Sequence, residues 1–202
     1  MTDFLAMLNG THREIDYRET PQGPVRSLLI RREYDAEIAD VWDAITDPER
    51  LRRWFVPVNG DLREGGTFQL QGNAGGEIRR CRAPSLLAVT WAYGDAPASD
   101  VELRLSEAAG VTTLELHHAP VAETIDLAGR DVDPVLNDAE TGIWGLGTGW
   151  ELGTMGLAAY LAGTFQGDPA DAAESPEILE AADRVGAAWA EVVGASRRGT
   201  GA

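Results

Sequence analysis

Apolar and polar residues alternate along several segments in the middle of the chain, a pattern typical of strands with one buried and one exposed face. Runs of this kind cover residues 25–34, 66–71, 77–93, 101–105 and 113–117. The run 77–93 is interrupted by Ala83-Pro84-Ser85 and therefore predicts two strands. Because the runs follow one another closely, they predict an antiparallel sheet with one covered face.

Two short helices are predicted directly after the first of these strands. The first has apolar residues at the i, i+3, i+4 and i+7 positions of one helical face: Ile38, Val41, Trp42 and Ile45. Asp35 precedes it as a capping residue. The run Asp47-Pro48-Glu49 begins the second helix, because aspartate caps an N-terminus and proline loses no hydrogen bond in the first turn.

The last third of the chain also shows helical spacing. A helix that begins near Gly149 carries four apolar residues: Trp150, Met155, Leu157 and Leu161. After a loop, Ser175-Pro176-Glu177 marks another helix start. The apolar stripe that follows consists of Ile178, Ala182, Val185, Trp189 and Val192. This stripe must be buried against the same chain or against a partner.

Together these elements predict an α+β fold, in which a strongly bent antiparallel sheet wraps around a long C-terminal helix and an extra helix follows. We expect an N-terminal arm at 1–24, one domain at 25–165, and a loop with an additional C-terminal helix at 166–202. The length of 202 residues fits one domain with an appendage. A bent sheet around one helix seldom fills completely, so we expect an apolar cavity between them.

Composition excludes several partners. The chain has 17 basic residues, all arginine, against 33 acidic ones, for a net charge of −16. Such a charge repels nucleic acids and anionic membranes, and we expect neither as a partner. Cys81 is the single cysteine, so no disulfide forms within the chain, and no secretory signal precedes Glu14. We therefore expect a cytoplasmic protein. The weakly charged stretch 141–166 is too rich in glycine and threonine to predict a membrane span.

Five motifs occur in an order that is typical of one superfamily. They are Val41-Trp42-Asp43-Ala44-Ile45-Thr46-Asp47-Pro48-Glu49 with Arg53-Trp54-Phe55 and Pro57, then Asp61-Leu62-Arg63-Glu64-Gly65-Gly66, Pro84 through Thr90-Trp91, Leu114-Glu115-Leu116-His117-His118, and Gly149-Trp150. The chain thus resembles the helix-grip (SRPBCC) superfamily, which includes START lipid-transfer domains and the birch-pollen allergen. The branch it resembles is named after the C-terminal domain of the activator of heat-shock protein 90 ATPase.

This resemblance covers about residues 25 to 165 and implies a helix-grip fold with a pocket. It implies an activity much less strongly, because members include lipid and polyketide binders, cyclases and cochaperone domains. We expect the pocket to be lined by Trp54, Phe55, Phe68, Val89, Trp91, Leu103, Leu116, His118, Trp150 and Met155. The alternative is that the aromatic residues fill the core and leave no room.

Two adjacent histidines on one strand must point to opposite faces, so His117 and His118 do not bind one metal together. His118 is in phase with Leu114 and Leu116 and should face inward. It is then either a polar anchor or acid–base group in the pocket, or a hydrogen-bonded core histidine, and the second interpretation is favoured.

Other candidate motifs do not carry a site. The glycine-rich run 145–149 lacks the spacing and the lysine of a phosphate loop, so close packing or a mobile loop explains it better. Cys81 has no convincing base. The acidic pairs Asp131/Asp133 and Asp138/Glu140 favour a solvated loop over a metal site, and a solvated position is favoured for Glu151.

From the residues and the resemblance we expect no cofactor and no metal. The favoured hypothesis is a non-enzymatic domain that binds a small apolar or amphipathic molecule. The alternative is a protein-interaction or cochaperone-like module, or a homodimer, that uses the C-terminal helix. An enzyme of the cyclase or hydrolase kind that uses His118 is a third and weaker hypothesis.

Overall fold

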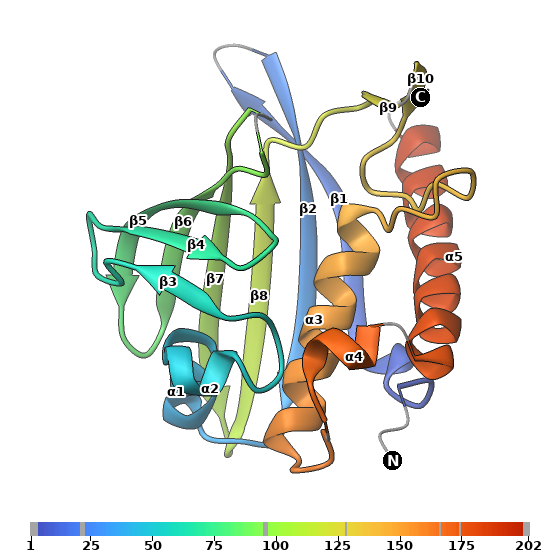
Figure 1. Ribbon diagram of the computed structural model, residues 1–202. Helices are drawn as coiled ribbons and strands as arrows, with labels where there is room; N and C mark the ends of the chain where they lie inside the picture. Colours follow the sequence, from blue (N-terminus) through green and yellow to red (C-terminus); the bar gives the residue numbers. More distant parts are fainter. Residues whose placement is uncertain are drawn as a thin grey trace.

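A highly curved antiparallel sheet holds a long helix on its concave face in the computed structural model, which describes residues 4–20, 23–94, 97–127, 129–165, 167–173 and 175–199 (Figure 1). Within these ranges the sheet has eight strands: β1 (Thr11–Thr20), β2 (Gly23–Tyr34), β3 (Val58–Gly60), β4 (Thr67–Leu70), β5 (Gly75–Arg82), β6 (Leu86–Trp91), β7 (Ser99–Ala108) and β8 (Val111–Ala119). Their order is β1-β2-β8-β7-β6-β5-β4-β3. A separate hairpin is formed by β9 (Ile125–Leu127) and β10 (Arg130–Val132).

The helices among the described residues are the 3-10 helix η1 (Leu8–Gly10), α1 (Ile38–Thr46), α2 (Pro48–Leu51), α3 (Leu146–Leu161), α4 (Pro169–Ala173) and α5 (Pro176–Gly199). Helix α3 lies along the concave face of the sheet, and α5 packs beside it against β1 (Figure 1). The predicted α+β helix-grip architecture is thus confirmed, with two short helices after β2 and an extra helix at the C-terminal end.

The two short helices begin for different reasons. Asp47 caps α2 as predicted, because its carboxylate accepts hydrogen bonds from the backbone N–H groups of Glu49 (2.7 Å) and Arg50 (3.4 Å). The prediction that Asp35 caps α1 is wrong. The N-cap is Glu37, which makes no side-chain cap bond, and the carboxylate of Glu107 on β7 accepts from the N–H of Ile38 instead (2.8 Å).

Strand β1 was not predicted, although it pairs with β2 along its whole length, from Thr11 opposite Arg32 to Thr20 opposite Gly23. The reason lies in the residues that face inward. Thr11 and Ile15 are buried and Arg13 lies between them, so polar side chains occupy inward positions and hide the alternation. Residues 11–20, expected as part of an arm, therefore form the edge strand of the main sheet.

Helix α3 begins at Leu146, earlier than the start predicted near Gly149. The segment before it explains the difference. Backbone carbonyls of Pro134 and Val135 accept hydrogen bonds from the N–H groups of Leu146 (2.8 Å) and Gly147 (3.2 Å), so the first turn needs no side-chain cap.

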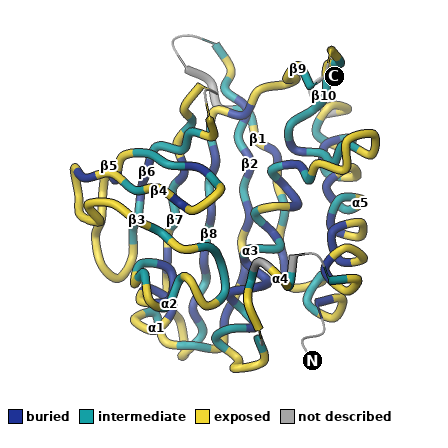
Figure 2. Tube along the Cα trace, in the orientation of Figure 1, coloured by how far each residue is buried: buried dark blue, intermediate teal, exposed yellow. Residues whose placement is uncertain are grey.

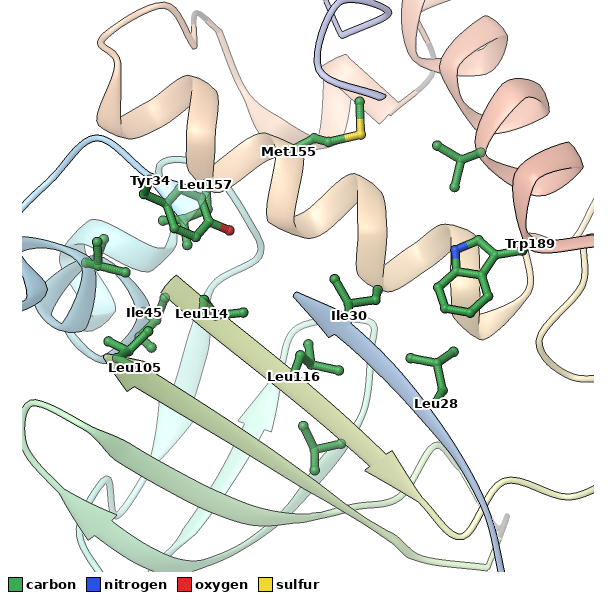
Figure 3. Packing of buried hydrophobic residues seen from close by; sticks show 14 of the residues in the cluster. Leu28, Ile30, Tyr34, Ile45, Leu105, Leu114, Leu116, Met155, Leu157 and Trp189 are labelled. Atoms are coloured by element: carbon green, nitrogen blue, oxygen red, sulfur yellow. The ribbon is translucent and has the colours of Figure 1, made fainter. Parts of the chain in front are cut away.

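The core lies between the sheet and the two long helices. Figure 3 shows side chains from β2, β8, α3 and α5 meeting there, among them Ile30, Leu116, Met155 and Trp189. The apolar stripe of α5 faces this core and leaves the opposite side of the helix exposed (Figure 2). Its buried residues are Ile178, Ala181, Ala182, Val185, Trp189 and Val193. The stripe is therefore covered by its own chain.

No helix in the part of the chain that the structure describes is long and apolar enough to span a membrane.

Candidate functional site

A cavity of about 170 Å³ lies between α3, the concave face of the sheet and the segment around α1 and α2. Eight of the ten residues expected at the pocket line it: Trp54, Phe55, Phe68, Val89, Trp91, Leu103, Leu116 and Trp150. Apart from indole N–H groups, polar side-chain atoms in the lining come from Thr46, Thr154 and Cys81. The wall is thus almost entirely apolar.

Aromatic rings from three elements form one side of this cavity. The ring centroids of Phe68 on β4 and Trp91 on β6 are 6.1 Å apart, and those of Trp91 and Trp150 on α3 are 4.6 Å apart. Trp54 and Phe55, which follow α2, make a second pair at 5.6 Å. We call Phe68, Trp91 and Trp150 the aromatic wall. Such tilted arrangements favour contact with flat apolar groups.

Behind this wall, His118 is buried and bonded at both ring nitrogens. The indole N–H of Trp150 donates to Nδ1 (2.9 Å), and Nε2 lies 2.6 Å from the hydroxyl of Ser99. The Ser99 hydroxyl in turn donates to the backbone carbonyl of Trp91 (3.2 Å). Burial lowers the pKa of His118 to about 4, so its imidazole is neutral at neutral pH.

His118 and Met155 do not belong to the lining, unlike the other eight residues. His118 faces inward as its phase predicts, but the Trp150 indole stands between it and the cavity side of α3. Met155 is fully buried on another side of α3. Helical spacing places Gly153, Thr154 and Leu157 on the side of Trp150, and these three do line the cavity.

Cys81 is the least expected lining residue. Simple alternation from Ile78 would turn residue 80 inward. A shift in the β5–β6 register between Ile78 and Arg80 places Cys81 opposite Leu87 instead, so that Cys81 rejoins the inward face. Burial, followed by the nearby carboxylate of Glu64, raises the pKa of its thiol.

Glu151 occupies a second polar centre, and the expectation that it is solvated is wrong, since it is 0% exposed. Its carboxylate accepts two hydrogen bonds from Arg13 on β1, one from Nε at 2.6 Å and one from Nη2. The indole N–H of Trp189 on α5 donates to the same carboxylate (3.0 Å). The sequence did not reveal this arrangement because Arg13 belongs to the unpredicted strand β1.

The glycine-rich run before and within α3 is a packing feature. A Cβ atom on Gly147 would lie 2.6 Å from the ring of Trp189, and one on Gly145 would lie 2.3 Å from the carbonyl oxygen of Val135. Close packing is therefore the interpretation that the structure supports for both glycines.

Two acidic residues that we expected to be solvated are held by arginines instead. Asp133 accepts from Arg26 (2.9 Å) and from Arg197 of α5 (2.8 Å), and Asp138 accepts from Arg130 (2.8 Å). Among the residues whose positions are described, no group of three or more His, Cys, Asp or Glu side chains gathers as a metal site requires.

Comparison with known proteins agrees with this fold. Residues 35–162 match the family model described as "Activator of Hsp90 ATPase homolog 1-like protein". A search of curated proteins found no match.

Among solved structures, CalU16 from Micromonospora echinospora is similar over nearly its whole length. Its solution NMR structure is 41% identical, covers 92% of this chain and 96% of its own, and has a TM-score of 0.73. Its crystal structure is 39% identical, covers 91% and 98%, and has a TM-score of 0.67.

More distant structures show the fold alone. DynU16, described as a putative protein in the dynemicin biosynthetic locus, is 22% identical over 71% of this chain and 48% of its own, with a TM-score of 0.54. The Aha1 dimer from Colwellia psychrerythraea is 15% identical over 69% and 98%, with a TM-score of 0.53. The segment that matches the family model extends from the residue after β2 to the residue after α3 and contains every residue of the cavity lining. The chain belongs to the family of Activator of Hsp90 ATPase homolog 1-like proteins.

Proposed function

We propose that the protein binds an uncharged, apolar small molecule in the cavity between α3 and the sheet, and that it does so as a binding domain rather than as an enzyme. The observation that carries this proposal is the cavity with its aromatic wall of Phe68, Trp91 and Trp150. Rings at these separations pack on one another and present a continuous apolar surface on which a flat ligand can lie.

The chemistry of the lining favours an uncharged ligand. The hydroxyls of Thr46 and Thr154 already donate to backbone carbonyls, at 2.7 Å and 2.8 Å. Buried polar side-chain atoms without a partner in the described residues belong to Arg26, Arg32 and Thr148, none of which lines the cavity. A charged group would therefore lose its hydration there without gaining an oppositely charged side chain.

The polar end of an amphipathic ligand would lie at the mouth. Leu62 is 38% exposed and Cys81 is exposed, yet both line the cavity, so the cavity meets solvent beside them. The apolar part of such a molecule would be buried in the cavity, and its polar end would remain hydrated beside Leu62.

The site offers little to a catalytic mechanism. The lone pair on Nδ1 of His118 is occupied by Trp150, and His118 does not reach the lining. The raised pKa of Cys81 keeps its thiol protonated near neutral pH, which makes it a poor nucleophile.

A protein-interaction role would need a surface other than the apolar stripe of α5. That stripe is buried against the same chain, with Trp189 and Val185 fully covered. A homodimer or another protein partner would therefore bind elsewhere on the molecule.

To test this proposal, the same glycine-to-leucine substitution is made at two positions of α3, one that lines the cavity and one that does not. A Cβ atom on Gly153 would have Phe55 at 3.8 Å as its near neighbour, and Gly153 lines the cavity, whereas Gly149 is exposed with open space around it. Gly153→Leu therefore fills the cavity, and Gly149→Leu adds the same side chain outside it. Binding is followed by the fluorescence of N-phenyl-1-naphthylamine, an uncharged probe.

We expect the parent and Gly149→Leu proteins to bind the probe with the same affinity and Gly153→Leu to lose at least about 10-fold, or about 1.4 kcal/mol. Equal binding by the two leucine variants, with both folded by circular dichroism, would refute the cavity as the binding site.

A further inference from the structure

Trp150 forms part of the aromatic wall, where its indole ring packs against Trp91. The residue one turn further along α3 on the same side is Gly153, which contributes no side chain. The ring plane of Trp150 is tilted by 50° to Trp91 and stands at 80° to the imidazole of His118. The hydrogen bond to His118 is thus a directional contact that sets this tilt.

We propose that His118 is a positioning residue of the cavity, whose Nδ1 atom holds the Trp150 indole against Trp91 and so fixes the shape that accepts a flat ligand. This inference rests on the proposed binding function.

The hydrogen-bond chain allows one tautomer. An indole N–H only donates, so Nδ1 of His118 must accept, and the single proton of the neutral imidazole lies on Nε2. That proton is donated to the oxygen of Ser99, whose own hydroxyl donates to the carbonyl of Trp91. These consecutive hydrogen bonds therefore connect the side chain of Trp150 to the backbone of β6, the strand that carries Trp91.

The surroundings of His118 keep this acceptor available. Its neighbours across the sheet are Leu28 on β2 and Val101 on β7, both apolar. The buried charged groups on the elements around it are two cations of β2, Arg26 and Arg32, and Glu151 of α3, whose carboxylate is already bound by Arg13 of β1. None is left to stabilise a protonated imidazole, so the Nδ1 lone pair stays available at neutral pH.

The substitutions His118→Asn and His118→Gln test the two hydrogen bonds of His118 one at a time. Asparagine at residue 118 places an amide oxygen near the position of Nδ1, where it accepts from Trp150. Glutamine reaches the position of Nε2, where it serves Ser99 and leaves the indole without an acceptor. Both are buried amides of similar polarity, so a merely structural role of His118 would not distinguish them.

The experiment measures N-phenyl-1-naphthylamine affinity for the parent, His118→Asn and His118→Gln proteins, with folding checked by circular dichroism. We expect His118→Asn to bind within about 3-fold of the parent and His118→Gln to bind at least about 10-fold more weakly. The indole N–H signal of Trp150, assigned in nitrogen-15 spectra with Trp150→Phe, should exchange slowly with solvent in the parent and His118→Asn and rapidly in His118→Gln.

A measurement on the parent protein alone covers the case in which the variants do not fold. Nitrogen-15 shifts of the His118 ring at pH 7 should show a bare Nδ1 and a protonated Nε2. A proton on Nδ1 would overturn the inference. Probe binding by the parent with equal affinities for the two amide variants would also overturn it, and would leave the proposed function intact. Absence of probe binding by the parent would instead refute the proposed function and, with it, the role of His118 in ligand selection.

Discussion

Trp189 on α5 donates its indole N–H to the fully buried carboxylate of Glu151 on α3, and Arg13 on β1 binds the same carboxylate through two nitrogens. One charged group thus joins the edge strand, the helix on the concave face and the extra helix. Both β1 and α5 lie outside the segment that matches the family model. Glu151 also follows directly after Trp150, so the residues that hold α5 and those that form the cavity are adjacent on α3.

Breaking this buried pair from one side should be strongly destabilising. Arg13→Met leaves the buried carboxylate of Glu151 without its arginine, and Glu151→Leu leaves Arg13 without its carboxylate, so each should lower the free energy of unfolding by about 3–5 kcal/mol. The double variant removes both charges and should lose much less than the sum. Urea unfolding of the four proteins at pH 7 measures the coupling. Strictly additive losses would contradict the ion pair as we describe it.

The two glycines at the start of α3 should respond to alanine in opposite directions. Gly147→Ala places a Cβ atom 2.6 Å from the buried Trp189 ring and should lower the stability by about 1–3 kcal/mol. Gly149→Ala has open space and should raise the stability by about 0.5–1 kcal/mol, because alanine favours the helix. Thermal unfolding monitored by circular dichroism measures both. A stabilising Gly147→Ala would show that α5 does not pack as closely as described.

His118 should make the fold sensitive to acid. Burial lowers its pKa from 6.5 to about 4, so between these values the unfolded chain binds a proton that the folded protein does not. The stability it supplies is fully present above pH 6.5 and is lost as the pH falls through about 4. Between pH 7 and pH 5 the loss should be about 2 kcal/mol.

The control for this pH dependence is His118→Asn, which keeps the acceptor for Trp150 and does not titrate. Urea unfolding at pH 7, 6 and 5 should show a smaller decline for His118→Asn than for the parent. Since His12 and His117 are present in both proteins, the difference belongs to His118. Parallel declines would show that the imidazole is not held neutral.

Cys81 at the cavity mouth should report whether the cavity is occupied. Its thiol is exposed and lines the cavity, so a bound ligand covers it. At a probe concentration ten times the dissociation constant, alkylation by a maleimide should slow about 10-fold, in proportion to the unoccupied fraction. In Gly153→Leu, whose affinity should be at least about 10-fold lower, the same probe concentration should slow alkylation by no more than about 2-fold. An unchanged rate in the parent under saturation would contradict the assignment of the mouth.

The sequence predicted the elements whose apolar residues follow one period without interruption. The alternation around Leu103 and Leu116 and the helical spacing from Ile38 to Ile45 lead directly to β7, β8 and α1. Strand β1 was missed because Arg13 and Thr11 occupy inward positions. They do so because the partner of Arg13 is a carboxylate 138 residues away, which no local pattern reveals.

For the site too, local patterns were predictable from the sequence and long-range contacts were not. The alternation along the strands predicted which of their aromatic residues face inward. Which side of α3 faces the cavity depends on how the helix packs, and the sequence pattern does not show this. Met155 and Trp150 lie on one helix, yet Met155 faces the core and Trp150 the cavity. Cys81 reaches the lining through a register shift that simple alternation does not contain. The role of His118 depends on Trp150, which is 32 residues away in the sequence.

The most direct test of the central claim is to locate the bound probe. Isotope-filtered nuclear Overhauser spectra of N-phenyl-1-naphthylamine with carbon-13-labelled protein should show contacts from the probe to the rings of Trp91 and Trp150 and to the methyl groups of Leu116, all of which line the cavity. Contacts confined to exposed apolar residues such as Leu5 and Leu179, at concentrations that saturate the fluorescence, would contradict a ligand site between α3 and the sheet.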